Sequence, residues 1–170
     1  MFILSVFLKK LSADDGIDIY EMLQEIPKDE NGFLNSVHDK TFEEYKQWLI
    51  YNEAFSKTTD LVDGWKVPTS TFWLYVDDKP VGIGRIRHFL TAKLLEEGGH
   101  AGYAIRPNER HKGYGTLLLK NLVTEARKLN IDKMLLTIQN QNLYSLRVAI
   151  ANRGVIERKN EIRNFVWIDC

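Results

Sequence analysis

The middle of the chain, from residue 100 to residue 138, alternates apolar and helical stretches around a basic turn. His100 to Ile105 forms a first apolar stretch, a helical pattern then continues to about Leu129, and Met134 to Ile138 forms a second apolar stretch. A strand, a helix and a strand connected in this way form a right-handed crossover, so we expect the two strands to be parallel neighbours. This unit predicts an α/β fold.

Hairpin patterns lie on both sides of this unit. Thr71 to Val76 and Val81 to Phe89 are rich in aromatic and β-branched residues, and the turn sequence Asp77 to Pro80 separates them. Val155 to Arg158 and Phe165 to Ile168 form a second pair near the C-terminus. Because hairpins contain antiparallel strands, we predict a mixed, mostly antiparallel sheet with one central parallel pair, flanked by helices.

The N-terminal part of the chain supplies further elements. Phe2 to Leu8 predicts a first strand, and Asp14-Asp15 are expected to cap a helix that ends before Pro27. A polar loop follows, and Thr41 to Glu44 then matches a capping box that opens a second helix. Residues 56–70 look irregular, which makes them a candidate loop over an acceptor site.

Composition bounds the class of protein. A chain of 170 residues with 44% apolar residues is expected to form one domain, residues 1–170. The one cysteine, Cys170, excludes a disulfide framework and a cysteine-based zinc site, which suits a reducing, cytoplasmic location, and we expect no metal. The apolar N-terminus is too short to span a membrane. The sequence lacks a basic face with interleaved aromatic residues, so we do not expect nucleic-acid binding.

The turn from Arg110 to Thr116 has the chemistry of a phosphate-binding loop. It feeds into a helix N-terminus, where backbone N–H groups lack intrahelical partners and attract anions. Gly113 and Gly115 allow positive φ and close backbone approach, and Arg110 and Lys112 add positive charge. We interpret this turn as a pyrophosphate cradle, which leaves more than one nucleotide diphosphate open as its ligand.

The pattern Arg110-x-x-Gly113-x-Gly115, after a strand and before a long helix, resembles the acyl-CoA loop of the GNAT superfamily of N-acyltransferases. Asn142-x-x-Ser145, at the head of a later helix, resembles the segment after that superfamily's fifth strand. Further segments resemble a little-characterised group of predicted bacterial acetyltransferases, so that the resemblance covers most of the chain. These segments are Trp65 to Leu74, Gly98 to Tyr103 and Ile105 to Arg110.

The resemblance implies a GNAT-like fold whose fourth and fifth strands splay apart around acetyl-CoA. It also implies transfer of the acetyl group to a primary amine of a small molecule or peptide, by direct attack in a ternary complex. The protein is then a monomer or a homodimer. The residues that the resemblance assigns to the co-substrate are Ala104, Ile105, Arg110, His111, Lys112, Gly113, Tyr114, Gly115, Thr116, Asn142 and Ser145.

The family's catalytic side chains are missing at their usual positions. In several members the base matches Gly99 or Ala101 of this chain, and the tyrosine acid matches Ala149, none of which can titrate. These gaps favour an alternative function, a non-catalytic acyl-CoA sensor or interaction module.

The catalytic candidates are instead His100 and Tyr103, which are close to these positions in the sequence, and Tyr144, which is expected near the thiol of the co-substrate. Strand alternation turns His100 to the opposite face unless a bulge intervenes, so a buried, hydrogen-bonded histidine is the alternative. For the two tyrosines, the alternative is an aromatic wall. A water chain that ends at Glu109, or at a residue of the 56–70 loop, is a further route for the proton.

Overall fold

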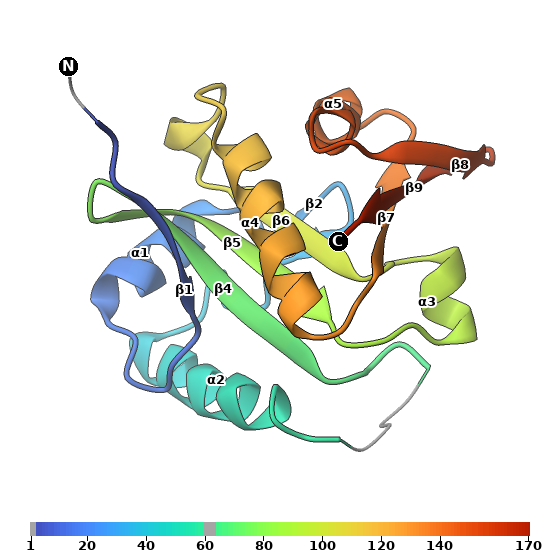
Figure 1. The fold of residues 1–170 in the computed structure, drawn as a ribbon. Coiled ribbons are helices and arrows are strands. Elements are labelled where there is room, and N and C mark those ends of the chain that lie inside the picture. The colour runs from blue at the N-terminus through green and yellow to red at the C-terminus, as the bar shows by residue number, and fades with distance from the viewer. Residues whose placement is uncertain (1–2, 60–63) are drawn as a thin grey trace.

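The computed structural model describes residues 3–59 and 64–170, which form two small antiparallel sheets and a short hairpin, with helices around them (Figure 1). The strands are β1 (Val6–Lys10), β2 (Asp29–Glu30), β3 (Phe33–Leu34), β4 (Thr69–Val76), β5 (Lys79–Arg87), β6 (Ala101–Ile105), β7 (Lys133–Gln139), β8 (Val155–Lys159) and β9 (Arg163–Asp169). The helices are α1 (Ile17–Glu25), α2 (Phe42–Phe55), α3 (Ala92–Glu96), α4 (Tyr114–Lys128) and α5 (Leu143–Ala151), and Pro107–Glu109 forms a 3-10 turn.

Both predicted hairpins are confirmed. The larger sheet has the order β1-β4-β5-β6 and the smaller one the order β7-β9-β8, and every neighbouring pair is antiparallel. Asp77 and Asp78, between β4 and β5, have φ angles of 49° and 62°. Two consecutive residues with positive φ match the twist of a two-residue hairpin turn, which is why this turn could be read from the sequence.

The two faces of the larger sheet carry different helices (Figure 1). On one face, a Cβ added to Gly84 would lie 2.8 Å from Leu122 of α4, so this glycine allows the close approach of α4 that its position in a strand suggested. On the other face, Ile83 is buried in a cluster with Met22 of α1 and Tyr45 of α2. Residues of β5 therefore alternate between an α4 face and an α1/α2 face.

The two strands of the predicted central pair, β6 and β7, meet at one end only, and in the described part of the chain they share no ladder of hydrogen bonds. His100 N donates to Leu135 O (2.8 Å), and Leu135 N donates to His100 Nδ1 (2.9 Å). Beyond this junction β6 and β7 belong to different sheets and line the two sides of a cavity. The two strands splay, as the resemblance implied.

The N-terminal predictions were less accurate. The expectation that Asp14-Asp15 cap the first helix is wrong. Helix α1 begins at Ile17, and its N-cap is Gly16, which has no side chain to cap the helix. Asp15 is buried instead, where it accepts hydrogen bonds from Trp73 Nε1 (2.7 Å) and Ser12 N (2.8 Å). The carboxylate therefore fastens the loop before α1 to β4, a tertiary role that outweighs capping.

Other boundaries also moved. The first strand is β1, Val6–Lys10, and Phe2 of the predicted strand lies outside the described residues. The predicted polar loop contains the β2–β3 hairpin, whose two-residue strands are too short to show alternation. The capping box is confirmed, because Thr41 Oγ1 accepts from Glu44 N (3.1 Å). Of the candidate acceptor loop 56–70, residues 60–63 lie outside the described residues.

Across residues 3–59 and 64–170, every helix is too short or too polar to cross a lipid bilayer.

Candidate functional site

A cavity of about 420 Å³ lies between the diverging strands β6 and β7. The loop after β6 and the start of α5 border it, as do the β2–β3 hairpin and three arginines from β5 and β9. In the part of the chain that the structure describes, no cluster of three or more His, Cys, Asp or Glu residues could hold a metal ion.

The loop from His111 to Thr116, the predicted pyrophosphate cradle, leads into the start of α4. Gly113, the N-cap of α4, has a φ of 82°, and a Cβ added to it would meet no atom within 4 Å. Within the described residues, the backbone N–H groups of this loop have no hydrogen-bond acceptor. Several N–H groups without an acceptor at a helix N-terminus can bind an anion such as a pyrophosphate.

Gly115 serves a different purpose. It lies inside the first turn of α4, and a Cβ there would come within 3.0 Å of the Tyr144 hydroxyl. Only Gly113 therefore uses the positive φ that glycine allows, whereas Gly115 lets α4 pack against α5.

The loop's cationic side chains are already held in ion pairs. Arg110 Nη2 lies 2.7 Å from Glu30 Oε1, and Arg110 Nε donates to Ile105 O (3.0 Å). Lys112 Nζ lies 2.8 Å from Glu109 Oε2. The cradle therefore presents mainly backbone N–H groups, while Arg110 fastens the β2–β3 hairpin to the end of β6.

The edge of β6 that faces the cavity has unpaired backbone groups. Arg87 N donates to His100 O (2.7 Å), and Arg106 N donates to Val81 O (2.8 Å), which fixes the alternation of hydrogen bonds between β5 and β6. In an antiparallel ladder only every second residue bonds to a given neighbour. The main-chain groups of Tyr103 and Ile105 therefore point away from β5, toward the cavity.

Tyr103 connects β6 to α5. Its hydroxyl lies 2.8 Å from Ser145 Oγ, and Asn142 Oδ1 accepts a hydrogen bond from Ser145 N (3.2 Å) as the predicted N-cap of α5. Burial raises the pKa of Tyr103 to about 12, so its hydroxyl stays protonated at neutral pH. A protonated hydroxyl inside the cavity can donate a hydrogen bond to an anion.

Tyr144 lies beside the loop. Its ring meets the His111 ring edge-on, with centroids 6.0 Å apart, and its hydroxyl faces Gly115. The side chain is 39% exposed. Tyr144 therefore lies beside the predicted cradle and lines the cavity.

His100 is buried at the junction of the two sheets. Its Nδ1 accepts the Leu135 N–H, and burial, with Arg87 nearby, lowers its pKa to about 4. The imidazole is neutral at pH 7, and one of its nitrogens is committed to the backbone. This geometry agrees with the alternative given for His100 in the sequence analysis, a buried, hydrogen-bonded histidine in place of a catalytic base.

Two other routes for a base are constrained. Gly99 has a φ of 60°, and a Cβ there would lie 2.5 Å from Leu135 O, so the junction leaves no room for a side chain at this family position. The Glu109 carboxylate accepts from Lys112 and Lys79, and these hydrogen bonds hold its pKa below the usual value. A carboxylate held in this way is a weak base at neutral pH.

Sequence reasoning missed the arginines at the other end of the cavity. Arg85 and Arg87 of β5 and Arg163 of β9 line it, together with Phe33 and Leu34 of β3. The sequence does contain a pattern that could have revealed them. Arg85 and Arg87 are two residues apart in a strand that is otherwise apolar, so their side chains share one face of that strand.

Known proteins resemble this chain in family and in fold. The model of the acetyltransferase (GNAT) family matches residues 20–154. The solved structure of N-acetyltransferase PseH from Campylobacter jejuni, in complex with acetyl coenzyme A, has a TM-score of 0.63 at 12% identity and covers 97% of this chain and 99% of that one. No curated protein matches the chain.

Two further solved structures have a similar fold. RimL, a ribosomal L7/L12 α-N-protein acetyltransferase in complex with coenzyme A, has a TM-score of 0.72 at 13% identity and covers 97% of this chain and 94% of that one. The putative acetyltransferase yncA from Salmonella typhimurium, with acetyl-CoA, has a TM-score of 0.62 at 13% identity, covering 96% and 93%. The family model covers most of the chain and the solved structures share its fold, so this chain belongs to the GNAT acetyltransferase family.

Proposed function

We propose that this protein transfers an acetyl group from acetyl-CoA to a primary amine of a small molecule or peptide. The observation that carries the proposal is the cavity between β6 and β7, whose lining includes Arg110 and His111 at the beginning of the loop that leads into α4. A long, thin co-substrate with a pyrophosphate in its middle fits a cleft that has an anion site at one end.

The chain's own backbone would hold most of the co-substrate. The N–H groups of the loop would bind the pyrophosphate, and the main chain of Tyr103 and Ile105 would pair with the pantetheine arm as a strand edge pairs with a peptide. Arg110 and Lys112 would act indirectly, through their ion pairs with Glu30 and Glu109.

The transfer would occur in one ternary complex. The neutral amine attacks the thioester carbonyl, a C–N bond forms, the C–S bond breaks, and the ammonium proton leaves to solvent water. Catalysis would come from positioning the two substrates and from hydrogen-bond donors near the developing oxyanion and the departing thiolate. Tyr103 is the candidate donor for the thiolate, because its hydroxyl is protonated and lies inside the cavity.

A direct test mixes purified protein with acetyl-CoA and a panel of primary amines, and follows the release of free thiol and the acetylated product. Calorimetry measures CoA binding in parallel. Release of thiol that depends on an amine supports the proposal, and the absence of turnover with every amine, despite measurable CoA binding, contradicts it.

The two tyrosines are expected to separate chemistry from binding. Tyr103→Phe should lower kcat by about a hundredfold, the effect of losing a general acid, with little change in the KM for acetyl-CoA. Tyr144→Phe should raise that KM by a few fold and leave kcat nearly unchanged, because Tyr144 borders the cradle. Steady-state kinetics on both variants make the comparison. If kcat falls in Tyr144→Phe and the KM for acetyl-CoA rises in Tyr103→Phe, then Tyr144 is the general acid and Tyr103 contributes to binding.

The ion pair between Arg110 and Glu30 gives a second prediction. Arg110→Glu places two carboxylates side by side and should weaken CoA binding about tenfold, because the hairpin then separates from the loop. Adding Glu30→Arg should restore affinity to within about threefold, since the pair is re-formed with its charges exchanged. If Arg110 instead touches the phosphate itself, calorimetry will show no recovery in the double variant.

A non-catalytic acyl-CoA sensor is the second candidate. The observation that favours it is the absence of room for a base at Gly99, together with the ion pairs of Glu109. Tight CoA binding without turnover of any amine in the assay above would favour the sensor.

A further inference from the structure

Arg85 and Arg87 lie at the end of the cavity that is remote from the cradle. Arg85 pairs with Gly102, and Arg87 N donates to His100 O, whereas the cradle follows Ile105 at the other end of β6. Along β6, Ile105 is three residues from the partner of Arg85, a span of about 10 Å, and five residues from the partner of Arg87, a span of about 17 Å. A co-substrate that enters at the cradle therefore has its far end directed toward the arginines.

The two arginines also lie on the face of the sheet opposite α4. Gly84 of β5 faces α4, so its neighbour Arg85 points to the α1/α2 face, where its guanidinium stacks on Phe33 of β3 at 4.5 Å. The cradle belongs to α4 on the first face. The cavity can thus receive the co-substrate from one face and a second substrate from the other.

Arg85 has unused hydrogen-bond donors in this cavity. Its one hydrogen bond among the described residues runs from Nη1 to Leu34 O (2.8 Å), and no described carboxylate lies within 4.0 Å of it. The buried polar side-chain atoms without a partner, in that same part of the chain, belong to other residues. The remaining guanidinium nitrogens of Arg85 are therefore accessible from the cavity.

Arg87 adds a second uncompensated charge. Its Nη1 donates to Gly98 O and Gly99 O, both at 3.1 Å, which fixes the turn before β6, and it too lacks a described carboxylate partner. Arg163, by contrast, pairs with Glu97 at 3.2 Å. Burial of Arg85, with Arg87 beside it, lowers the Arg85 pKa to about 10, as expected for two cations that lack a counter-ion.

A second hollow of about 250 Å³ continues beyond the arginines. It shares Leu34, Arg85 and Arg87 with the main cavity, and its other walls combine aromatic residues with polar ones such as Asn52 and Lys66. These aromatic residues are Trp48, Tyr51, Phe55 and Trp65. The arginines therefore lie between the main cavity and a hollow with a partly aromatic lining, where a small acceptor could bind.

We infer that the acceptor is a primary amine that also carries a carboxylate, and that Arg85, supported by Arg87, binds this carboxylate. Guanidinium donors match a carboxylate in a bidentate geometry, and polyamines or cationic peptide ends would be repelled by the two charges. The aromatic hollow would hold an apolar part of the acceptor. This inference rests on the proposed acetyl transfer to an amine and adds the class of acceptor.

The test compares matched amines that differ only in the carboxylate: phenylalanine with phenethylamine, and 4-aminobutyrate with butylamine. In the wild type, kcat/KM should be at least about thirtyfold higher for the carboxylate member of a pair, the range expected for a charge-assisted hydrogen bond. Arg85→Met should remove this preference and leave the KM for acetyl-CoA unchanged, whereas Arg85→Lys should keep part of it.

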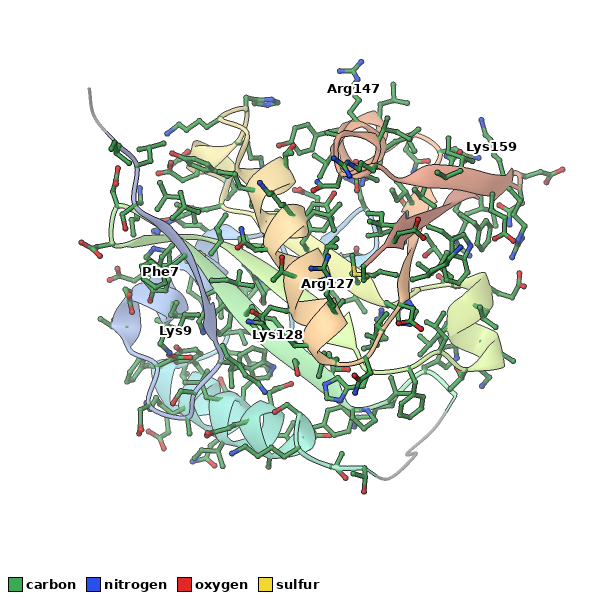
Figure 2. The ribbon with its side chains drawn as sticks, in the orientation of Figure 1. Phe7, Lys9, Arg127, Lys128, Arg147 and Lys159 are labelled. Carbon is green, nitrogen blue, oxygen red and sulfur yellow. The ribbon has the colours of Figure 1, made fainter. Side chains whose placement is uncertain are left out.

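Arg127→Met is the matched control, because Arg127 is an exposed arginine on the outward side of α4 (Figure 2). It should leave the preference intact. A thermal melt of each variant separates loss of binding from loss of fold.

Two outcomes overturn the inference. If phenethylamine and butylamine are acetylated as well as their carboxylate partners, the acceptor class is wrong while acetyl transfer stands. If no amine is turned over although CoA binds, the proposed function fails, and calorimetry with the carboxylate amines decides the inference. Binding by the wild type that is lost in Arg85→Met supports it, and absent or unchanged binding overturns it.

Discussion

Gly113→Val is expected to weaken acetyl-CoA binding by at least about a hundredfold. A β-branched residue at a φ of 82° is strained by roughly 1 to 3 kcal/mol, so the loop would move to relieve the strain. The new side chain would also add bulk at the N-cap of α4, beside backbone N–H groups that have no acceptor among the described residues. Both effects remove the geometry that would hold a pyrophosphate.

The fold itself should survive this substitution, because a Cβ at Gly113 meets no atom within 4 Å. Calorimetric titration with CoA gives the affinity, and circular dichroism verifies the fold. Gly16→Ala is a suitable control: Gly16 is also a helix N-cap, that of α1, but its φ is −96° and it lies outside the cavity. Native affinity in a folded Gly113→Val protein would exclude the cradle as the pyrophosphate site.

Local chemistry explains why the cradle could be predicted from the sequence. A strand, a turn with glycines and a helix start are consecutive in the chain, so their geometry follows from neighbouring residues alone. The partner of Arg110 could not be predicted in this way, because Glu30 is 80 residues distant in sequence. From the sequence, Arg110 and Lys112 suggested a loop with free positive charges. In the fold, Glu30 and Glu109 neutralise these charges, so the backbone N–H groups remain as the proposed ligands of the pyrophosphate.

Gly99 shows how a gap in a sequence pattern acquires a physical reason. From the sequence, this position merely lacks the titratable side chain found in several family members. In the fold, its positive φ and the carbonyl of Leu135 exclude any side chain, because the two sheets join at this point. The arginine-lined end of the cavity was missed for a related reason, since only the positions of β3 and α2 show which face of β5 the arginines occupy.

The junction of the two sheets therefore controls the shape of the cleft. β6 and β7 are held together at His100 and Leu135 by two hydrogen bonds, and they separate beyond it to form the cavity. One of those bonds requires a neutral imidazole, because the Nδ1 atom must accept the Leu135 N–H. Protonation of His100 would convert this acceptor into a donor and break the contact.

The free energy of unfolding is accordingly expected to fall as the pH drops from about 6.5 to about 4. Burial lowers the pKa of folded His100 to about 4, below its ordinary value of about 6.5, so the unfolded chain binds the proton more readily. Stability from this group is complete above the unfolded pKa and is lost as the pH approaches the folded pKa. Between pH 7 and pH 5 the loss should be about 2 kcal/mol.

Urea denaturation at pH 7, 6 and 5 measures this loss, and His100→Asn isolates the contribution of His100. The asparagine Oδ1 can replace Nδ1 as the acceptor for Leu135 N but does not titrate, so the variant should lose about 2 kcal/mol less than the wild type over this range. His111→Asn is the control, because His111 is exposed and should leave the wild-type slope unchanged. His88 is half-buried, partial burial lowers its pKa as well, and its contribution cancels in the comparison. Parallel pH curves for the wild type and His100→Asn would show that the junction does not depend on a neutral His100.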